Sequence, residues 1–252
     1  MERASARHKK TQSHVPPGGR TDLGGNTVSN ALLLSLPDAE FSLLQPHLEL
    51  VELPQQFIVH QPREPIAFAY FLNHGMASLV VLTSDGESVE VAIVGKEGMI
   101  GTPLAVGLTH APWRAIIQVR GAGLRIRAEA LQQVLQDAPE LRLILSRYLL
   151  IQSLQVAQIA ACNRLHSIEQ RLARWLLMCQ DRVNSDLLPV THELLSQMLG
   201  AGRPSVSLVA GNLQRAGIIR NLRGSLKIIA RDQLEKLACE CYRSILRFDG
   251  NS

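Results

Sequence analysis

The sequence predicts an α+β chain with an N-terminal β-rich domain, a long helix and a C-terminal winged helix-turn-helix. Three observations support this. Short β-type runs separated by Gly, Pro and Asn fill residues 48–127. A stretch without Gly or Pro then extends from Glu140 to Leu165. Near the C-terminus, two short amphipathic patterns flank the glycine-rich turn Gly200-Ala201-Gly202.

The length of 252 residues is enough for two domains with separate cores. No apolar run approaches the ~20 residues of a membrane span, and no charged-then-apolar N-terminus indicates secretion. We therefore expect a cytoplasmic protein without a membrane partner. The predicted parts are a disordered tail (1–28), a β-rich domain (29–138), a long helix with a hinge (139–166) and a C-terminal helical domain (167–252).

The first part of the chain is expected to be a tail followed by a sheet. Residues 1–28 are polar and lack apolar periodicity, which is typical of disorder. Short helices are predicted at Ala31–Leu36 and Asp38–Leu44. Several short strands separated by turn residues are predicted next, and this pattern favours a sandwich or a small barrel, whose interior can hold one small ligand. The predicted strands are Leu48–Leu53, Phe57–His60, Ala67–Leu72, Ala77–Leu82, Ser88–Val94, Ala115–Val119 and Leu124–Arg127.

A short helix at Ala128–Asp137 precedes the long one. A helix over Glu140–Leu165 would be about 37 Å long, more than one small domain can cover, so we expect it to pair with the same helix of a second chain. Ser167 begins the next helix with a capping box, which places a hinge at His166-Ser167. The near-heptad seam expected to form the dimer comprises Leu141, Leu145, Tyr148, Gln152, Gln155 and Ile159.

The segment from Val190 to Leu213 has the spacing of a helix-turn-helix. Thr191 is a suitable N-cap for the first helix, and Pro204 lies in the first turn of the second. The outer face of the second helix has small or polar residues, which allows entry into the DNA major groove, and Arg203 at its start can bind guanine bidentately. The residues predicted to contact DNA here are Thr191, His192, Arg203, Ser205, Ser207, Leu208 and Asn212.

A basic hairpin is predicted directly after these helices. Two β-prone runs, 218–221 and 226–229, are joined by a glycine-containing turn. This order of elements is that of a winged helix-turn-helix. Arg220, Arg223 and Lys227 would then contact phosphates, which fixes register without discriminating bases.

Charge and cysteine content agree with this scheme. Residues 29–166 have nine basic against twelve acidic residues, whereas residues 167–252 have twelve against eight, so the C-terminal part is the more positive. The four cysteines contain no CxxC pair and are expected to be reduced cytosolic thiols. Cys239 and Cys241 alone are too few for a structural zinc site, so no metal is predicted.

Together these segments resemble the Crp/Fnr family of bacterial transcription regulators over roughly Ala31–Leu246. The segment VTHELLSQMLGAGRPSV is similar to the family's helix-turn-helix without a gap, and YFLNHG at 70–75 and GMIG at 98–101 resemble turns around its ligand site. The resemblance implies a cyclic-nucleotide-binding-like β-barrel (a double-stranded jelly roll), a dimerisation helix and a winged helix-turn-helix. It also implies a homodimer, a palindromic double-stranded DNA operator and RNA polymerase as a partner.

The ligand region departs from the cyclic-nucleotide-binding members. They follow the second turn with Glu for the ribose and have Arg-Ser for the phosphate, whereas here Thr102-Pro103 follows Gly101, and Arg114-Ala115 stands in the phosphate region. A buried cyclic phosphate would be poorly paired, so cyclic AMP is disfavoured. The residues expected to line a ligand pocket are Gly98, Gly101, Thr102 and Arg114.

No cofactor is predicted. Residues 1–30 contain no cysteine, which excludes the iron–sulfur cluster of the family's oxygen sensors. Haem stays open, with His60, His74 or His110 as candidate ligands, although a lone histidine is more often structural.

Two other functions are disfavoured relative to a DNA-binding regulator, which is not an enzyme. A jelly-roll metalloenzyme would need clustered His-x-His ligands, and the histidines of the β-rich domain are singletons. A ligand-sensing module acting on a protein partner without DNA is disfavoured by Arg203 and the basic wing.

Overall fold

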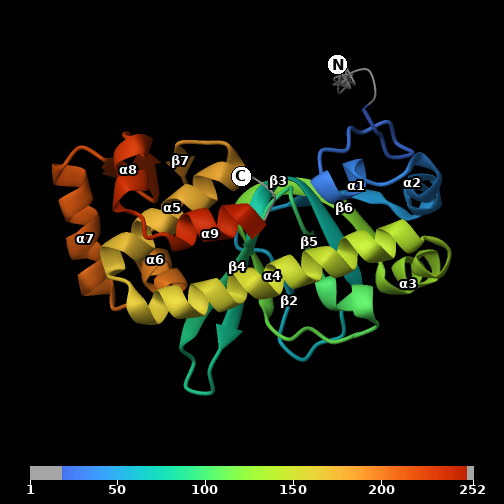
Figure 1. The fold of residues 1–252 in the computed structure, drawn as a ribbon, viewed down its shortest axis with the longest axis horizontal. Helices are drawn as coiled ribbons and strands as arrows, with labels where there is room; N and C mark the ends of the chain where they lie inside the picture. The colour runs from blue at the N-terminus through green and yellow to red at the C-terminus, as the bar shows by residue number, and fades with distance from the viewer. Residues whose placement is uncertain (1–18, 249–252) are drawn as a thin grey trace, which may run out of the picture.

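The protein, seen in a computed structural model, is described from residue 19 to residue 248. A β-rich domain lies at one end of the molecule and a mainly helical domain at the other (Figure 1). The long helix α4 (Pro139–Leu165) crosses in front of the sheet and reaches both domains.

The β-rich domain has one bent sheet with short helices at its outer end (Figure 1). The strands are hydrogen-bonded in the order β1-β6-β3-β4, with β2 paired to β6 and β5 paired to β3, all antiparallel. Its strands are β1 (Glu49–Leu53), β2 (Ile58–His60), β3 (Phe68–Leu82), β4 (Ser88–Val94), β5 (Met99–Ile100) and β6 (Arg114–Arg127). Its helical segments are α1 (Ala31–Leu34), α2 (Asp38–Leu44), η1 (Gln45–His47), η2 (Thr102–Val106) and α3 (Ala128–Asp137).

Strands β3 and β6 correct the sequence prediction, which divided each of them into two strands. Gly75 and Gly121 do not make turns but lie opposite each other in the β3–β6 ladder, where its register shifts. A Cβ on Gly121 would overlap the carbonyl oxygen of His74, and Gly75 has φ +90°. The glycines therefore let two long strands bend and approach each other without breaking.

The expected β-barrel is also corrected, because the sheet is not closed into a barrel. It keeps the jelly-roll arrangement, in which β3 from Phe68 to Val80 pairs with β6 and the shorter strands flank them. The inner surface is filled by apolar side chains, among them Leu53, Tyr70, Leu72, Leu79 and Ile117.

The N-terminal segment expected to be disordered is folded where the structure describes it. Within residues 19–28, Thr21 and Thr27 form a β-bridge and Val28 is buried. The Arg20 guanidinium donates to the carbonyl oxygens of Leu33 and Leu36, so it anchors the segment on the end of α1. Residues 1–18 of the predicted tail lie outside the described residues.

The predicted dimer seam of α4 faces the interior of its own chain. All six residues are buried. Leu141, Leu145 and Tyr148 pack with the N-terminal helices, and Ile159 packs with the C-terminal domain. Gln152 accepts a hydrogen bond from Thr102 Oγ1, and Gln155 accepts one from the backbone N–H of Ile93. The seam is therefore not available to a second chain, because the β-rich domain and the C-terminal domain of the same chain cover it. The seam residues are Leu141, Leu145, Tyr148, Gln152, Gln155 and Ile159.

The opposite face of α4 carries a second apolar stripe. Leu143, Leu150 and Leu154 are 41%, 61% and 40% exposed, and Ala157 and Ala161 continue the heptad spacing. Among the described helices α4 alone is long and apolar enough, by composition, to cross a membrane. Its apolar residues instead divide between a buried face and this exposed stripe.

The C-terminal domain begins after the break at His166. Ser167 caps its first helix with a capping box, since Ser167 Oγ accepts from the N–H of Gln170 and the Gln170 side chain accepts from the N–H of Ser167, which confirms that prediction. Its elements are α5 (Ile168–Val183), β7 (Leu187–Leu188), α6 (His192–Leu199), α7 (Arg203–Arg215), β8 (Ile219–Leu222), β9 (Ser225–Ile228), α8 (Arg231–Leu237) and α9 (Cys241–Phe248).

The two domains share one hydrophobic core. Met76, Val80 and Ile93 of the sheet pack with Trp175 and the other buried side chains of the helical domain. At this junction the buried Glu90 accepts hydrogen bonds from Trp175 Nε1, at 2.7 Å, and from Ser78 Oγ. Burial raises the pKa of the Glu90 carboxyl to about 7, against the opposing effect of these two donors. The junction therefore holds a carboxyl group that titrates near neutrality.

Candidate nucleic-acid interface

Local chemistry positions the two helices of the helix-turn-helix. Thr191 caps α6 by accepting a hydrogen bond from the N–H of Leu194, as predicted. Gly200 ends α6 in the left-handed conformation, φ +53°, which a residue with a Cβ adopts only at a cost. Helix α7 starts at Arg203, and Val206, Ala210 and Leu213 bury its inner face. The outer face of α7 is left on the surface.

The exposed face of α7 contains most of the residues predicted to contact bases. Arg203, Ser205, Leu208 and Asn212 are at least partly exposed, and Leu208 is 64% exposed although it is apolar. The Arg203 guanidinium lies 3.4 Å from the Glu193 carboxylate in an ion pair whose side chains are 67% and 57% exposed. Such surface pairs contribute little stability, so Arg203 can exchange this partner for a base edge.

His192 and Ser207 were also predicted to contact DNA, but they bind each other. His192 Nδ1 is 3.1 Å from Ser207 Oγ, and His192 Nε2 is 3.2 Å from Asn221 Oδ1. His192 therefore links the first helix of the motif to α7 and to the wing. We assign it a positioning role in this arrangement, and Asn221 is a residue that the sequence analysis missed.

The wing is the β8–β9 hairpin with Arg223-Gly224 at its turn. Arg220 and Lys227 are directly opposite each other in the register, and both are exposed, as is Arg223. Like charges opposite each other on a hairpin repel, and a polyanion would relieve this repulsion. Strand β7, which the sequence analysis did not predict, pairs with β9 and fixes the wing to the domain.

The four residues expected to line a ligand pocket do not lie together. Gly98 and Gly101 pack tightly, since a Cβ on Gly98 would overlap the Tyr148 hydroxyl and a Cβ on Gly101 would lie 3.3 Å from the Ala69 Cα. Thr102 is buried and donates to Gln152 of α4 at 2.8 Å. Arg114 lies elsewhere, because it pairs in register with Val80, far along β3 from the Tyr70–Ile100 pair. Its Nε donates to Gln61.

The three histidines named as candidate haem ligands differ in their burial. His74 and His110 are exposed. His60 is buried, and neither of its ring nitrogens has a hydrogen-bond partner in the structure. Burial lowers the pKa of His60 to about 4, so its imidazole is neutral at physiological pH.

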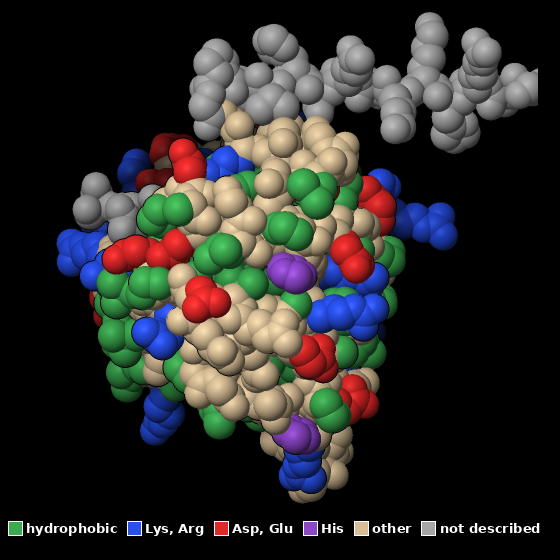
Figure 2. All heavy atoms as spheres, turned by 90° about the vertical axis from the view of Figure 1, so that its right-hand side faces the viewer, with side chains coloured by type: hydrophobic (Ala, Val, Ile, Leu, Met, Phe, Trp, Pro, Cys, Tyr) green, Lys and Arg blue, Asp and Glu red, His purple; other side chains and the backbone are tan. Residues whose placement is uncertain are grey.

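The end of the molecule opposite the helix-turn-helix has a mixed surface. On this face the described Lys and Arg side chains are interspersed with Asp and Glu and with small apolar groups (Figure 2). A single-sign electrostatic field is therefore not formed there. The ordered basic groups on α7 and the wing remain the best candidate surface for a polyanion.

Comparison with protein families supports this site. Residues 170–237, which include α6, α7 and the wing, match the model of a Crp-like helix-turn-helix domain. The chain is also 24% identical over 168 residues to a curated protein named "Global nitrogen regulator" from Nostoc sp. (strain PCC 7120). That alignment covers 63% of this chain and 75% of the relative.

Solved structures show the same fold. The c-di-GMP responsive global regulator of Xanthomonas campestris has a TM-score of 0.64 and 18% identity, covering 76% of this chain and 99% of that one. A transcriptional regulator of the CRP/FNR family from Thermus thermophilus has a TM-score of 0.63 and 21% identity, covering 75% and 98%.

Proposed function

This chain belongs to the Crp/Fnr family and is a DNA-binding transcription regulator, and from that premise we propose that it binds a palindromic operator as a homodimer. Recognition would be through α7, with the wing on the flanking phosphates. The observation that carries the proposal is the exposed outer face of α7 beside the paired wing cations Arg220 and Lys227. As a regulator the chain is not an enzyme, which removes the metalloenzyme alternative.

The proposed dimer forms through the exposed stripe of α4. Crp/Fnr regulators act as dimers, and the stripe presents Leu143, Leu150, Leu154, Ala157 and Ala161 on one helix face. A two-fold axis beside this face would bring two copies of the stripe together in an isologous interface. It would place two α7 helices for half-sites about 34 Å apart, one turn of DNA.

The residues of α7 suit direct contact with base edges. Arg203 can donate two hydrogen bonds to guanine, and Leu208 can contact a thymine methyl group. Asn212 Oδ1 accepts a hydrogen bond from Arg215, which leaves its amide N–H groups for an acceptor on a base or a phosphate. Thr191, at the N-terminus of α6, is exposed toward the phosphate backbone in this docking.

Substitution of Arg203 tests base recognition. Arg203→Ala should weaken binding to the operator by about 1–3 kcal/mol and binding to scrambled DNA much less, because a bidentate guanine contact exists only on the true site. Arg223→Ala should weaken both by similar factors and lower the slope of log K against log salt by about one. Binding titrations on both duplexes at several salt concentrations measure these effects, after the operator is selected from random duplexes.

Arg243→Ala is the matched control, since Arg243 is an exposed arginine of α9 and its loss removes the same charge. It should bind both duplexes as the parent protein does. Equal weakening of operator and scrambled DNA by Arg203→Ala would contradict the role of Arg203 in base recognition. The contact would then have to be assigned to Ser205 or Asn212.

We propose that the signal acts at the β-rich domain and is not cyclic AMP. Thr102 is already bonded to Gln152, and Arg114 is not near it, so no carboxylate–hydroxyl–arginine set for a cyclic nucleotide is assembled among the described residues. Calorimetric titration should give a dissociation constant above about 1 mM. Micromolar affinity would show that these residues rearrange around the nucleotide.

The remaining parts of the proposal follow from the family. Crp/Fnr regulators are soluble DNA-binding proteins, and we propose a cytoplasmic location, where the operator and RNA polymerase are found. RNA polymerase is proposed as the partner through which bound protein alters transcription. If haem is the signal group, His60 is the buried imidazole with free ring nitrogens that would ligate its iron.

A further inference from the structure

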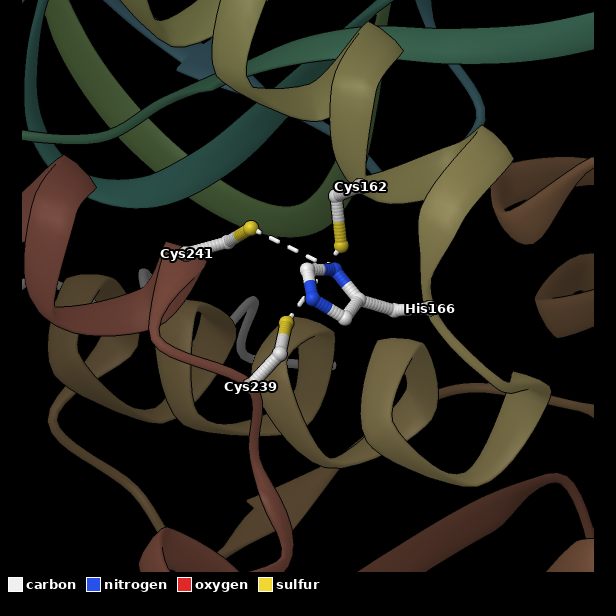
Figure 3. Close-up of side chains that lie close together, drawn as sticks. All are labelled: Cys162, His166, Cys239 and Cys241. Carbon is white, nitrogen blue, oxygen red and sulfur yellow. Dashed lines mark hydrogen bonds between the residues drawn. The ribbon is translucent and has the colours of Figure 1, made fainter.

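Four side chains of types that can bind a metal ion lie close together at the C-terminal end of α4. Only two of the four cysteines, Cys239 and Cys241, are close together in the sequence, and two thiols alone predict no metal site. The structure adds Cys162 and His166 to them, and the side chains point toward one another (Figure 3). We propose that Cys162, His166, Cys239 and Cys241 bind one tetrahedral zinc ion that joins α4 to the start of α9.

The distances fit a single ion. The four ligand atoms all lie within 4.8 Å of one another, with Cys162 Sγ 3.4 Å from Cys239 Sγ and Cys241 Sγ 3.5 Å from His166 Nδ1. Bonds of about 2.3 Å to sulfur give a tetrahedron with edges of about 3.8 Å, so small side-chain movements complete the site. An iron–sulfur cluster distributes its protein ligands over two or more iron atoms, so it needs ligands that are spread more widely.

The donor set is that of a structural zinc site. Three thiolates and one imidazole, without an open position, are typical of zinc ions that hold a fold together. Cys162, Cys239 and Cys241 are buried and form a cluster of their own. Cys162 and His166 are four residues apart at the helix end, so they lie on one face of the final turn.

Neighbouring groups support the four ligands. Glu240 Oε1 lies 3.2 Å from His166 Nε2, which would hold the other nitrogen, Nδ1, toward the metal. Gln158 Nε2 donates to Cys241 Sγ at 3.1 Å. Both contacts are of the kind that orients metal ligands in proteins.

Two buried arginines lie where they can balance the charge of the proposed metal site. A zinc ion with three thiolates has a net charge of −1. Arg171 and Arg174 are buried beside Cys162 and interact with it electrostatically, and neither forms an ion pair with a carboxylate among the described residues. Each has an Nε without a hydrogen-bond partner. Arg174 also interacts with the Glu90 carboxyl, so the metal site would add a second source of negative charge beside these two buried guanidinium groups.

Metal content of the full-length protein tests the proposal. Protein purified under reducing conditions should contain one zinc per chain by mass spectrometry, and cobalt exchanged into it should show the visible bands of tetrahedral thiolate coordination. A mercurial reagent should release the zinc. A strong chelator should lower the melting temperature, because the ion binds the folded state.

Variants separate metal binding from a purely structural role. Cys239→Ser and His166→Ala should lose the zinc, whereas His166→Cys, which restores four donors, should retain it. Glu240→Gln should weaken zinc affinity about 10- to 100-fold. Cys179→Ser is the matched control, since Cys179 is a buried free cysteine outside the cluster, and it should keep one zinc.

Three results would overturn the assignment. One is folded, reduced parent protein with no zinc and no cobalt bands after reconstitution. Another is copper or iron in place of zinc. The third is a Cys162–Cys239 disulfide in the isolated protein, shown by thiol counting and peptide mapping. Circular dichroism of each variant establishes that loss of zinc is measured on folded protein.

Discussion

Protein in which both Leu150 and Leu154 are replaced by glutamate is expected to be monomeric and to lose operator binding. A leucine buried in an interface contributes about 1.5–3 kcal/mol, and a two-fold axis counts each residue twice. Four buried leucines lost from the proposed dimer therefore amount to about 6 kcal/mol or more, or about four orders of magnitude in the dimer dissociation constant. Analytical ultracentrifugation and operator titration measure the two effects.

Leu23→Glu is the matched control for this variant, because Leu23 is 69% exposed but lies on the N-terminal segment rather than on α4. It should remain dimeric. The buried seam offers no such test, since Leu145→Asp or Ile159→Asp would place a charge in the core of the chain itself and unfold it. A dimeric Leu150→Glu/Leu154→Glu protein with a normal melting temperature would show that another surface forms the dimer.

Glu90→Gln is expected to remove a pH dependence of about 3 kcal/mol from the free energy of unfolding. The folded-state pKa of about 7 is above the ordinary value of 4.5, so the folded state keeps a proton that the unfolded chain has released. Stability from this group is therefore complete below about pH 4.5 and falls as the pH rises to about 7. At pH 8 the glutamine variant should be the more stable protein, because it has no buried charge.

Thermal and denaturant unfolding at about pH 5, 6, 7 and 8 give the comparison, with the variant subtracted from the parent so that other titrating groups cancel. Glu87→Gln is the control, since Glu87 is exposed and precedes the same strand. Arg174 and Arg182 are the cations near Glu90, and both favour its charged form. Parallel stability curves for the parent and Glu90→Gln would contradict a proton held at Glu90.

The helix-turn-helix could be predicted from the sequence because its determinants are local. The Thr191 cap, the turn glycine Gly200 and the spacing of apolar residues on α6 and α7 act within a few residues of one another. The wing turn at Arg223-Gly224 is equally local. The structure confirms these elements within a residue or two of the predicted bounds.

The sheet shows where local patterns mislead. Gly75 and Gly121 are of the residue type that is common in turns. Their role here instead depends on the contact between them across the β3–β6 ladder, although they are 46 positions apart in the chain. The local sequence of either segment does not indicate such a contact. The same limit explains why Arg114 was grouped with Thr102, although Arg114 pairs with Val80 and the strand just before Thr102 pairs at Tyr70, near the other end of β3.

Helix α4 shows a different limit of prediction from the sequence. An apolar seam predicts burial but not the partner, and this helix has two seams. The more polar one, with Gln152 and Gln155, is covered by the chain's own β-rich domain, where both amides have hydrogen-bond partners. The metal site was missed for a related reason, since Cys162 and Cys239 are 77 residues apart and only the fold brings them together.

The shared core of the two domains sets an energetic requirement on signalling. Pivoting the C-terminal domain about His166 would expose Met76, Val80 and Ile93 and would break the Trp175–Glu90 hydrogen bond. The arrangement described here is therefore a separate free-energy minimum rather than one point on a smooth motion. A ligand that reverses a 99:1 preference between two such arrangements must bind the second about 10⁴-fold more tightly, which is about 5.5 kcal/mol of differential affinity. Loss of the proton from Glu90 would lower the differential affinity that the ligand needs. The same concentration of ligand would then switch more of the protein in alkaline than in acidic surroundings.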